Sequence, residues 1–158
     1  SLTALDDDQL RLVRNLPLFE LQDFPGQFTK MQEGVSHYTM ADFSIEGFEV
    51  KSGDKASICF LKEPRPAWAP LYEQLHVQSL PREIFHTTYC FESFSDLPEK
   101  VKLGILNDLR ANFEQIRNRD VGGELFSTVL KRAPLFWHQE TGAPLTVCDL
   151  LNPEDDLM

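Results

Sequence analysis

Helical periodicity is clearest in the second half of the chain, just after Ser95. Apolar residues recur every three or four positions, which places them on one face of a helix: Leu97, Val101, Ile105, Leu109, Phe113 and Ile116. Asp96 and Glu99 have the spacing of a capping box, and Pro98 suits a first turn. The pattern predicts a helix over 96–119, about six turns long, with one face in the core.

Three shorter stretches carry weaker helical patterns. In the first, Thr3 can cap the helix, three aspartates follow at the positive end of the helix dipole, and Pro17 ends the pattern. Another begins at Pro70, and a third follows the Gly122-Gly123 break. The sequence therefore predicts helices over 3–16, 70–77 and 124–132.

Alternation of apolar and polar residues replaces the helical period between His37 and Lys62. Glu46-Gly47 and Ser52-Gly53-Asp54 interrupt it, and the second break is typical of a hairpin turn. An antiparallel meander is the simplest interpretation of 37–62. The segment 83–93 is apolar on both faces, which is typical of a central strand.

Together these elements predict a single α+β domain over 1–158, with the helix over 96–119 packed on one face of an antiparallel sheet. The sheet is built from strands within 37–62 and 83–93. A chain of 158 residues with 42% hydrophobic side chains, 12 of them phenylalanine, can bury a sizeable core. An acidic tail over 149–158 is expected to extend into water.

Charge narrows the range of partners. The sequence has 25 acidic against 15 basic side chains, a net charge of −10, and its basic residues are scattered. Nucleic-acid affinity comes largely from lysine and arginine, and an acidic surface also repels anionic lipid. We therefore expect no nucleic acid and no membrane as partner. A basic partner protein or a cationic ligand is compatible with the charge, and we expect the partner to be another protein. No oligomeric state is predicted.

The positions of the cysteines and the absence of common motifs indicate the cellular compartment and the kinds of chemistry to expect. Cys59, Cys90 and Cys148 stand far apart, which argues against a disulfide framework and against a zinc finger. The aspartate-rich N-terminus differs from a signal peptide, and phosphate-binding patterns such as GxGxxG do not occur. We expect a cytoplasmic protein with no cofactor, no structural metal and no recognisable catalytic residue.

A first candidate site lies in the segment "PLFWHQETGAP". Trp137, His138 and Glu140 stand close together, and on a strand His138 and Glu140 would share a face. A metal site would need a third ligand, which Cys148 could in principle supply, but the stretch has none of the spacings that specify a metal site. The alternative is that the segment packs as a terminal strand with His138 at its rim.

A second candidate consists of Trp68, Tyr72 and His76, which are spaced four apart. If the helix extends back to Trp68, the three side chains project from one face and could line a ligand pocket or a protein interface. Aromatic residues at helical spacing are also common in cores. In that case they would form the boundary of a short helix lying on the sheet.

His86 is a third candidate. On a strand it shares a face with Thr88 and Cys90, but no oxyanion-hole signature lies nearby. We expect His86 to be hydrogen-bonded inside the fold and Cys90 to act as a small hydrophobic group.

Two hypotheses about function remain open. The first is a small acidic intracellular binding or regulatory module that acts through protein–protein contacts. The alternative is a small-ligand-binding protein or an enzyme that uses His76, His86 or His138 with neighbouring aromatic side chains. Whether a histidine lies in a concave pocket distinguishes the two hypotheses.

Overall fold

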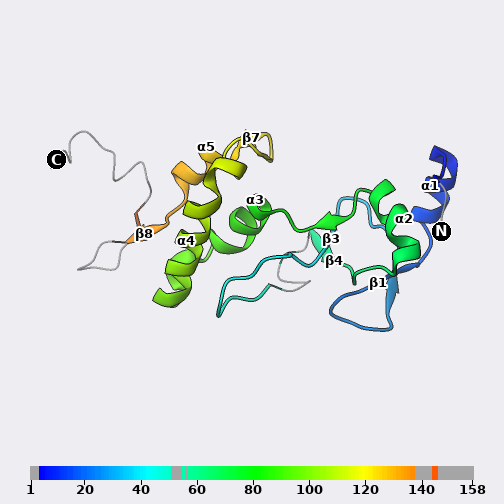
Figure 1. The fold of residues 1–158 in the computed structure, drawn as a ribbon, viewed down its shortest axis with the longest axis horizontal. Coiled ribbons are helices and arrows are strands. Elements are labelled where there is room, and N and C mark those ends of the chain that lie inside the picture. Colours follow the sequence, from blue (N-terminus) through cyan, green and yellow to red (C-terminus); the bar gives the residue numbers. More distant parts are fainter. Residues whose placement is uncertain (1–3, 51–54, 56, 138–143, 146–158) are drawn as a thin grey trace. The chain divides into compact units, whose positions relative to one another are not determined.

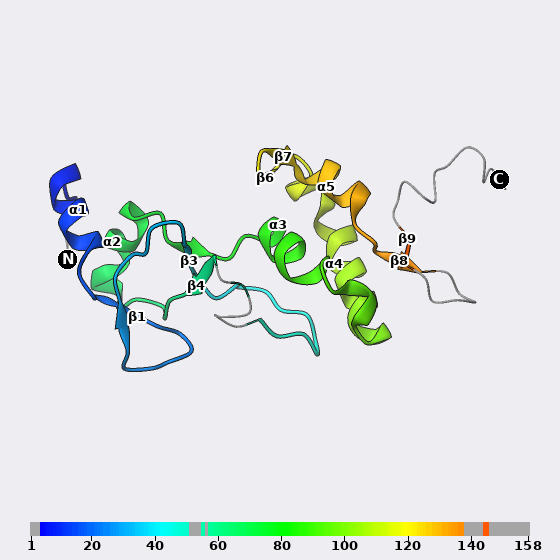
Figure 2. The ribbon, with the colours of Figure 1, turned by 180° about the vertical axis from the view of Figure 1, so that it is seen from behind.

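The computed structural model describes residues 4–50, 55, 57–137 and 144–145. Its elements are mixed helices and strands, labelled from opposite sides in Figure 1 and Figure 2. The contacts cluster in two compact units. The first unit contains Ser1–Asp42 and Val50–Pro81, and the second contains Phe43–Glu49 and Arg82–Met158. The prediction of one domain over 1–158 stays a prediction.

The first helix, α1, spans Asp7–Arg14. Its cap is Asp6, whose side chain accepts a hydrogen bond from the Gln9 backbone at 2.8 Å, while the Gln9 side chain accepts one from the Asp6 backbone at 3.0 Å. This reciprocal pair fixes the start of the helix. The helix predicted over 3–16 is therefore present but shorter, and it is capped at Asp6 rather than at Thr3.

The first unit contains a small parallel sheet. β3 (Ser36–Thr39) lies between β4 (Ile58–Phe60) and β5 (Gln78–Ser79), and both pairings are parallel. β1 (Phe19–Glu20) pairs antiparallel with β2 (Phe28–Thr29). An antiparallel bridge between Leu21 and Leu61 joins this hairpin to the β4 side. A 3₁₀ turn over Pro66–Trp68 and helix α2 (Ala69–Gln74) connect β4 to β5.

The predicted antiparallel meander over 37–62 is wrong in its direction. The predicted strands exist, but β3 and β4 run parallel. The connection between β3 and β4 explains why the two strands are parallel. Part of it, Phe43–Glu49, belongs to the second unit, so the chain returns to the sheet and β4 can run in the same direction as β3.

The predicted turn at Glu46-Gly47 is present, closed by a hydrogen bond from the Phe48 N–H to the Ile45 carbonyl at 3.0 Å. The hairpin predicted at 52–54 lies outside the described residues.

An apolar cluster forms part of the core of the first unit. α2 contributes Leu71 and Tyr72, β4 contributes Cys59, and Leu61 follows β4 directly. Leu10 and Val13 of α1, and Leu5 before it, pack partly against this cluster, whereas Leu12 is 69% exposed. The remaining buried members of the cluster are Phe19, Met31, Leu75 and Val77.

The second unit is largely helical. α3 (Arg82–Ile84) continues into a π-helical segment, η2 (Phe85–Cys90), and a 3₁₀ turn over Phe94–Asp96 follows. α4 spans Glu99–Ile116 and α5 spans Phe126–Arg132. The short antiparallel pairs are β6 (Asp120–Val121) with β7 (Glu124–Leu125) and β8 (Phe136–Trp137) with β9 (Pro144–Leu145).

The strand predicted over 83–93 is wrong, because this segment is helical. It has no polar face because it is surrounded by core on several sides: Phe85, His86, Tyr89, Cys90 and Phe91 are all buried. Periodicity cannot distinguish a fully buried strand from a fully buried helix. With this segment helical, the structure has no antiparallel sheet that combines it with 37–62 among the residues it describes.

α4 confirms the predicted apolar face, since Val101, Ile105, Leu109 and Ile116 are buried. Gly104 allows a close approach within the unit, because a Cβ added there would lie 3.0 Å from the Ile45 side chain. The predicted capping box does not form: Asp96 belongs to the preceding 3₁₀ turn, and Pro98 precedes the helix. Packing of α4 on the sheet stays a prediction, since the sheet belongs to the first unit.

None of the helices in the described part of the chain is long and apolar enough to span a membrane.

Candidate functional site

The segment that precedes α2 positions Trp68. Pro66 starts the 3₁₀ turn, and Pro70 occupies the first turn of α2, where proline is tolerated because it lacks an N–H donor. The Trp68 N–H donates to the Arg65 carbonyl at 2.8 Å. This closed turn leaves the Trp68 side chain 37% exposed at the surface of the first unit.

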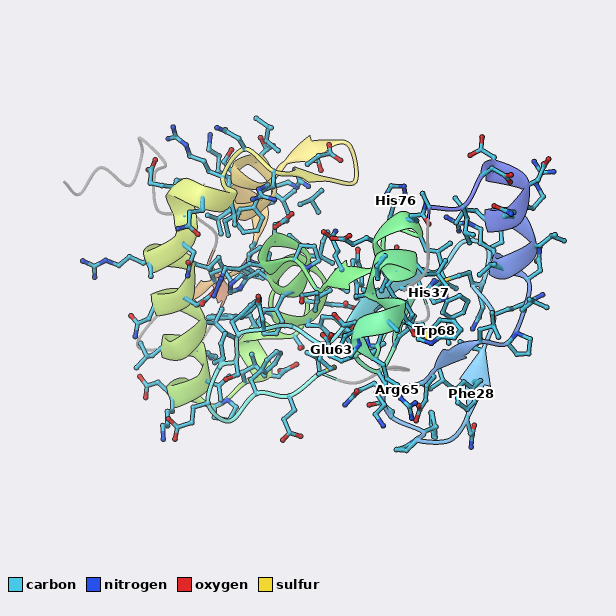
Figure 3. The ribbon with its side chains drawn as sticks, turned by 45° about the vertical axis from the view of Figure 1, so that its right-hand side comes forward. Phe28, His37, Glu63, Arg65, Trp68 and His76 are labelled. Atoms are coloured by element: carbon cyan, nitrogen blue, oxygen red, sulfur yellow. The ribbon has the colours of Figure 1, made fainter. Side chains whose placement is uncertain are left out.

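Trp68 lines a cavity of about 310 Å³ that we call the Trp68 cavity. Phe28 and Tyr72 are the other aromatic residues that line this cavity. Figure 3 labels Phe28 and Trp68 among the side chains of the first unit. The other residues of the wall are apolar or charged: Leu18, Pro64, Glu20, Lys62, Glu63 and Arg65. The site therefore joins three aromatic rings with charges of both signs.

The three aromatic side chains differ in exposure. Phe28 is 53% exposed and Trp68 is 37% exposed, whereas Tyr72 is buried and packs edge-on against Phe19 with ring centroids 5.7 Å apart. Burial raises the pKa of Tyr72, and the charges of Glu20 and Glu63 raise it further. The phenol therefore stays protonated and keeps a hydroxyl donor at the cavity wall.

Glu20 organises the rim of the Trp68 cavity. Its carboxylate accepts a hydrogen bond from the Gly26 N–H at 3.1 Å and lies 3.6 Å from the Lys62 ammonium group. Gly26 has a φ of 86°, so the turn depends on glycine at this position. Through this turn Glu20 fixes the loop that leads into β2 and to Phe28.

His76 does not line the Trp68 cavity. α2 ends at Gln74, so the spacing of four that relates Trp68 to Tyr72 does not continue to His76. His76 instead adopts a φ of 62° just after the helix. Its N–H donates to the Glu73 carbonyl at 3.0 Å, and the next N–H, of Val77, donates to the Tyr72 carbonyl at 2.9 Å. This is the Schellman arrangement with histidine where glycine is usual.

His76 lines a second cavity of about 230 Å³, which we call the His37 cavity. Arg14 reaches it from the last turn of α1, and Ser36, His37 and Tyr38 reach it from β3. Figure 3 labels both histidines. No pattern in the sequence indicates this grouping, because its members lie on elements that only the fold brings together.

The ring of His37 is held by backbone groups. Its Nε2 accepts a hydrogen bond from the Gln32 N–H at 3.3 Å, so the neutral ring carries its proton on Nδ1. Burial lowers the pKa of His37; a hydrogen bond with the Val35 backbone opposes this, and the positive charge of Arg14 lowers the pKa further. Arg14 and His37 are therefore close enough to interact electrostatically.

His86 lies in the second unit and is fully buried. Its Nε2 lies 2.7 Å from Asp108 Oδ2, and the Arg82 Nε donates to the same oxygen at 3.0 Å. The Arg82 guanidinium also lies over the ring of Phe43, 4.0 Å from its centroid. The expectation that His86 is hydrogen-bonded inside the fold is confirmed.

Opposing effects act on Asp108. Burial raises the pKa of its carboxyl, but hydrogen bonds and charge from His86, and then from Arg82, outweigh burial and hold the pKa below its usual value. Burial and the nearby Asp108 charge raise the pKa of the Cys90 thiol far above its usual range. Cys90 therefore stays a protonated, hydrophobic side chain, unsuited to nucleophilic attack.

The remaining candidates from the sequence cannot be placed together. Trp137 belongs to β8, while His138 and Glu140 lie outside the described residues. Among the residues that the structure describes, no three histidine, cysteine or acidic side chains are grouped so that they could hold a metal ion. Comparison with protein-family models, with curated proteins and with solved structures gave no match to this chain.

Proposed function

We propose that this chain is a protein-binding module whose first unit binds an extended segment of a partner protein at the Trp68 cavity. One observation carries the proposal: Phe28 and Trp68, two large aromatic side chains that remain substantially exposed, line the same cavity together with Tyr72. Exposed aromatic groups around one concavity are typical of binding sites rather than of solvent-facing surface.

The size and chemistry of the cavity support a peptide anchored by one bulky side chain. A volume of about 310 Å³ is at the lower end of ligand sites, which suits a single apolar side chain. Tryptophan and tyrosine give a large contact area at low entropic cost, and they dominate binding energies at protein interfaces. The phenol of Tyr72 adds a hydrogen-bond donor that could orient the backbone of the segment.

Charge supports a segment with basic residues beside the anchor. The chain carries a net charge of −10, and two carboxylates, Glu20 and Glu63, line the cavity. A negative protein attracts a basic partner over distances comparable with the Debye length, so binding should weaken as salt is added. We assign the module to the cytoplasm, which is supported by two buried free cysteines, Cys59 and Cys90.

An enzymatic role is less well supported. His86 is fully buried and bonded to Asp108, so it has no surface to offer a substrate. The raised pKa of Cys90 keeps the thiol protonated. His76 lines a cavity, but its grouping with Arg14 and His37 is better suited to binding than to proton transfer, as argued below.

The test is selection of binding peptides from a random library against the full chain, followed by affinity measurements with variants. We expect the selected peptides to share an apolar anchor with basic neighbours, and Trp68→Ala or Phe28→Ala to weaken their binding by about thirtyfold or more. Binding should also weaken with salt.

Phe24→Ala is the matched control. Phe24 and Phe28 are both 53% exposed and belong to the same loop and hairpin region, but only Phe28 lines the cavity. Affinity should be unchanged in Phe24→Ala, and thermal unfolding should be close to wild type in all three variants. Equal losses in the Phe24 and Phe28 variants, or peptides that bind Trp68→Ala normally, would refute the proposal.

A further inference from the structure

Three basic side chains line the His37 cavity: Arg14, His37 and His76. None of the described residues in its wall is acidic, although the chain has 25 acidic side chains against 15 basic ones. The other polar groups of the wall are donors as well as acceptors, namely a hydroxyl from Ser36, a phenol from Tyr38 and amides from Gln32 and Gln78. The cavity is therefore an electropositive concavity in an acidic protein.

Basic residues at a helix C-terminus often serve only to stabilise the negative end of the helix dipole. Arg14 lies in the last turn of α1 and His76 just after α2, so this explanation has to be weighed. Backbone donors already satisfy carbonyl groups at the ends of both helices. The Arg14 carbonyl accepts from the Met31 N–H at 2.9 Å, and the last carbonyls of α2 accept from His76 and Val77. The side chains of Arg14 and His76 are not needed for capping.

His76 also occupies its position at a conformational cost. A left-handed residue other than glycine costs roughly 1–2 kcal/mol in backbone energy. Glycine would make the same Schellman turn without that cost. Strain of this kind is often retained at functional sites, and here the strained residue contributes an imidazole to the cavity wall.

We propose that the His37 cavity is a binding site for an oxyanion, with a phosphate group as the ligand class. Arg14 provides the guanidinium fork, which matches two oxygens of a phosphate. His76 adds a donor, and a second positive charge when protonated. Ser36 and Gln78 supply neutral donors, while His37, whose two ring nitrogens are engaged with the backbone, forms a fixed wall.

This site is separate from the Trp68 cavity in its residues, and no residue lines both. The two proposals can therefore fail independently. A phosphate site could be filled by the free ion or by a phosphorylated side chain, and both present the same oxygens to Arg14.

The test is titration of the full chain with inorganic phosphate, followed by ¹H–¹⁵N and histidine ring NMR signals. We expect saturable shifts at His37, His76 and Ser36, with a dissociation constant on the order of millimolar. O-phosphoserine in a second arm shows whether a phosphorylated side chain is accepted as well as the free ion. Absence of saturable shifts at these residues would refute the proposal.

Two variants and one control locate the site. Arg14→Gln should weaken phosphate binding at least about tenfold, because it removes the charged fork. Arg11→Gln is the matched control, because Arg11 lies on the same helix, pairs with Asp8 at 3.7 Å, and does not line the cavity. His76→Gly should weaken binding while keeping the fold, since glycine relieves the strain. Equal effects of Arg11→Gln and Arg14→Gln would show a nonspecific charge effect and overturn the assignment.

A second readout uses the linkage between the anion and His37. Sulfate stays a dianion through the range in which histidine titrates, so its binding adds no titration of its own. The titratable and charged groups in the cavity wall are Arg14, His37, Tyr38 and His76. An anion beside Arg14 offsets the positive charge that lowers the pKa of His37, so saturating sulfate should raise that pKa. The increase should be absent in Arg14→Gln, and its persistence there would contradict the role of Arg14.

Discussion

The first unit has an apolar core and carries its charges and exposed aromatic groups at the surface, whereas the second unit holds a largely buried cluster of polar and charged side chains against its core. Phe19, Leu61 and Tyr72 represent the first kind of core. The His86–Asp108 pair, with Arg82 beside it, represents the second. Both cavities described above belong to the first unit.

This difference suggests how the chain divides its tasks. An apolar core tolerates a surface with open cavities, because apolar packing needs only the right volume and shape. A buried charge cluster is less tolerant, since removing one member leaves the others without a partner. This contrast is consistent with the proposal that binding occurs in the first unit, and we expect the second unit to be the part whose stability depends most strongly on single side chains.

The largest expected effect is that of a charge placed in the core of the second unit. Leu109 is 5% exposed on the buried face of α4, so Leu109→Asp would bury an unpaired carboxylate and cost more than about 4 kcal/mol of unfolding free energy. Hydrogen exchange should show that amide protection in α4 is lost. The same experiment tests the prediction of one domain, because a single cooperative domain would lose protection in β3 and β4 as well.

Leu103→Asp is the control on the same helix. Leu103 is 49% exposed, so a carboxylate there remains in water and stability should stay close to wild type. Similar destabilisation by the two substitutions would show that the apolar face of α4 is not the core of the second unit.

The long helix shows how far the sequence alone leads. The apolar spacing from Val101 to Ile116 predicts α4, because a helix of this length repeats its pattern several times. Strands of two to four residues carry too few positions for such a repeat, so the direction of β3 and β4 depends on where their connection runs. That connection passes through the second unit, which no local pattern indicates.

The candidate sites were partly predictable for the same reason. Spacing of four relates Trp68 to Tyr72 within one helical stretch, and the structure places both in one cavity. Phe28 joins them only because the β1–β2 hairpin bridges to the β4 side, a pairing distant in sequence. Arg82 and His86 are spaced four apart, which would have indicated a shared face if 83–93 had been interpreted as a helix.

The next effect concerns the buried charges of the second unit. Asp108→Ala would leave His86 and Arg82 without their common acceptor and should cost about 3 kcal/mol of unfolding free energy near neutral pH. Denaturant unfolding measures the loss. Glu124→Ala is the control, because it breaks an exposed pair with Arg132 and should change stability little. Equal losses would contradict the contrast between buried and exposed charge.

The pH dependence of this loss has a definite sign. The pKa of Asp108 lies below its ordinary value of 3.8 in the folded protein, so its ionised form is favoured by folding. Its contribution is fully present above pH 3.8 and is lost as the pH falls through the lower, folded-state pKa. The difference in stability between wild type and Asp108→Ala should therefore shrink in that acidic range. A difference that grew on acidification would show that the carboxylate is not stabilised by its partners.

The smallest effect concerns strain in the first unit. His76→Gly removes the left-handed penalty but adds the unfolded-state entropy of glycine, so we expect a net gain of about 0.5–1 kcal/mol in unfolding free energy. Gly34→Ala is the reverse experiment in the same unit. Gly34 has a φ of 77° and no atom within 4 Å of an added Cβ, so any loss of stability there reports backbone conformation alone. If His76→Gly instead destabilised the protein as much as Gly34→Ala, the imidazole would be contributing packing energy. His76 would then be retained because its side chain stabilises the fold. The contrast between a first unit adapted to binding and a second unit stabilised by buried polar and charged groups would lose this support.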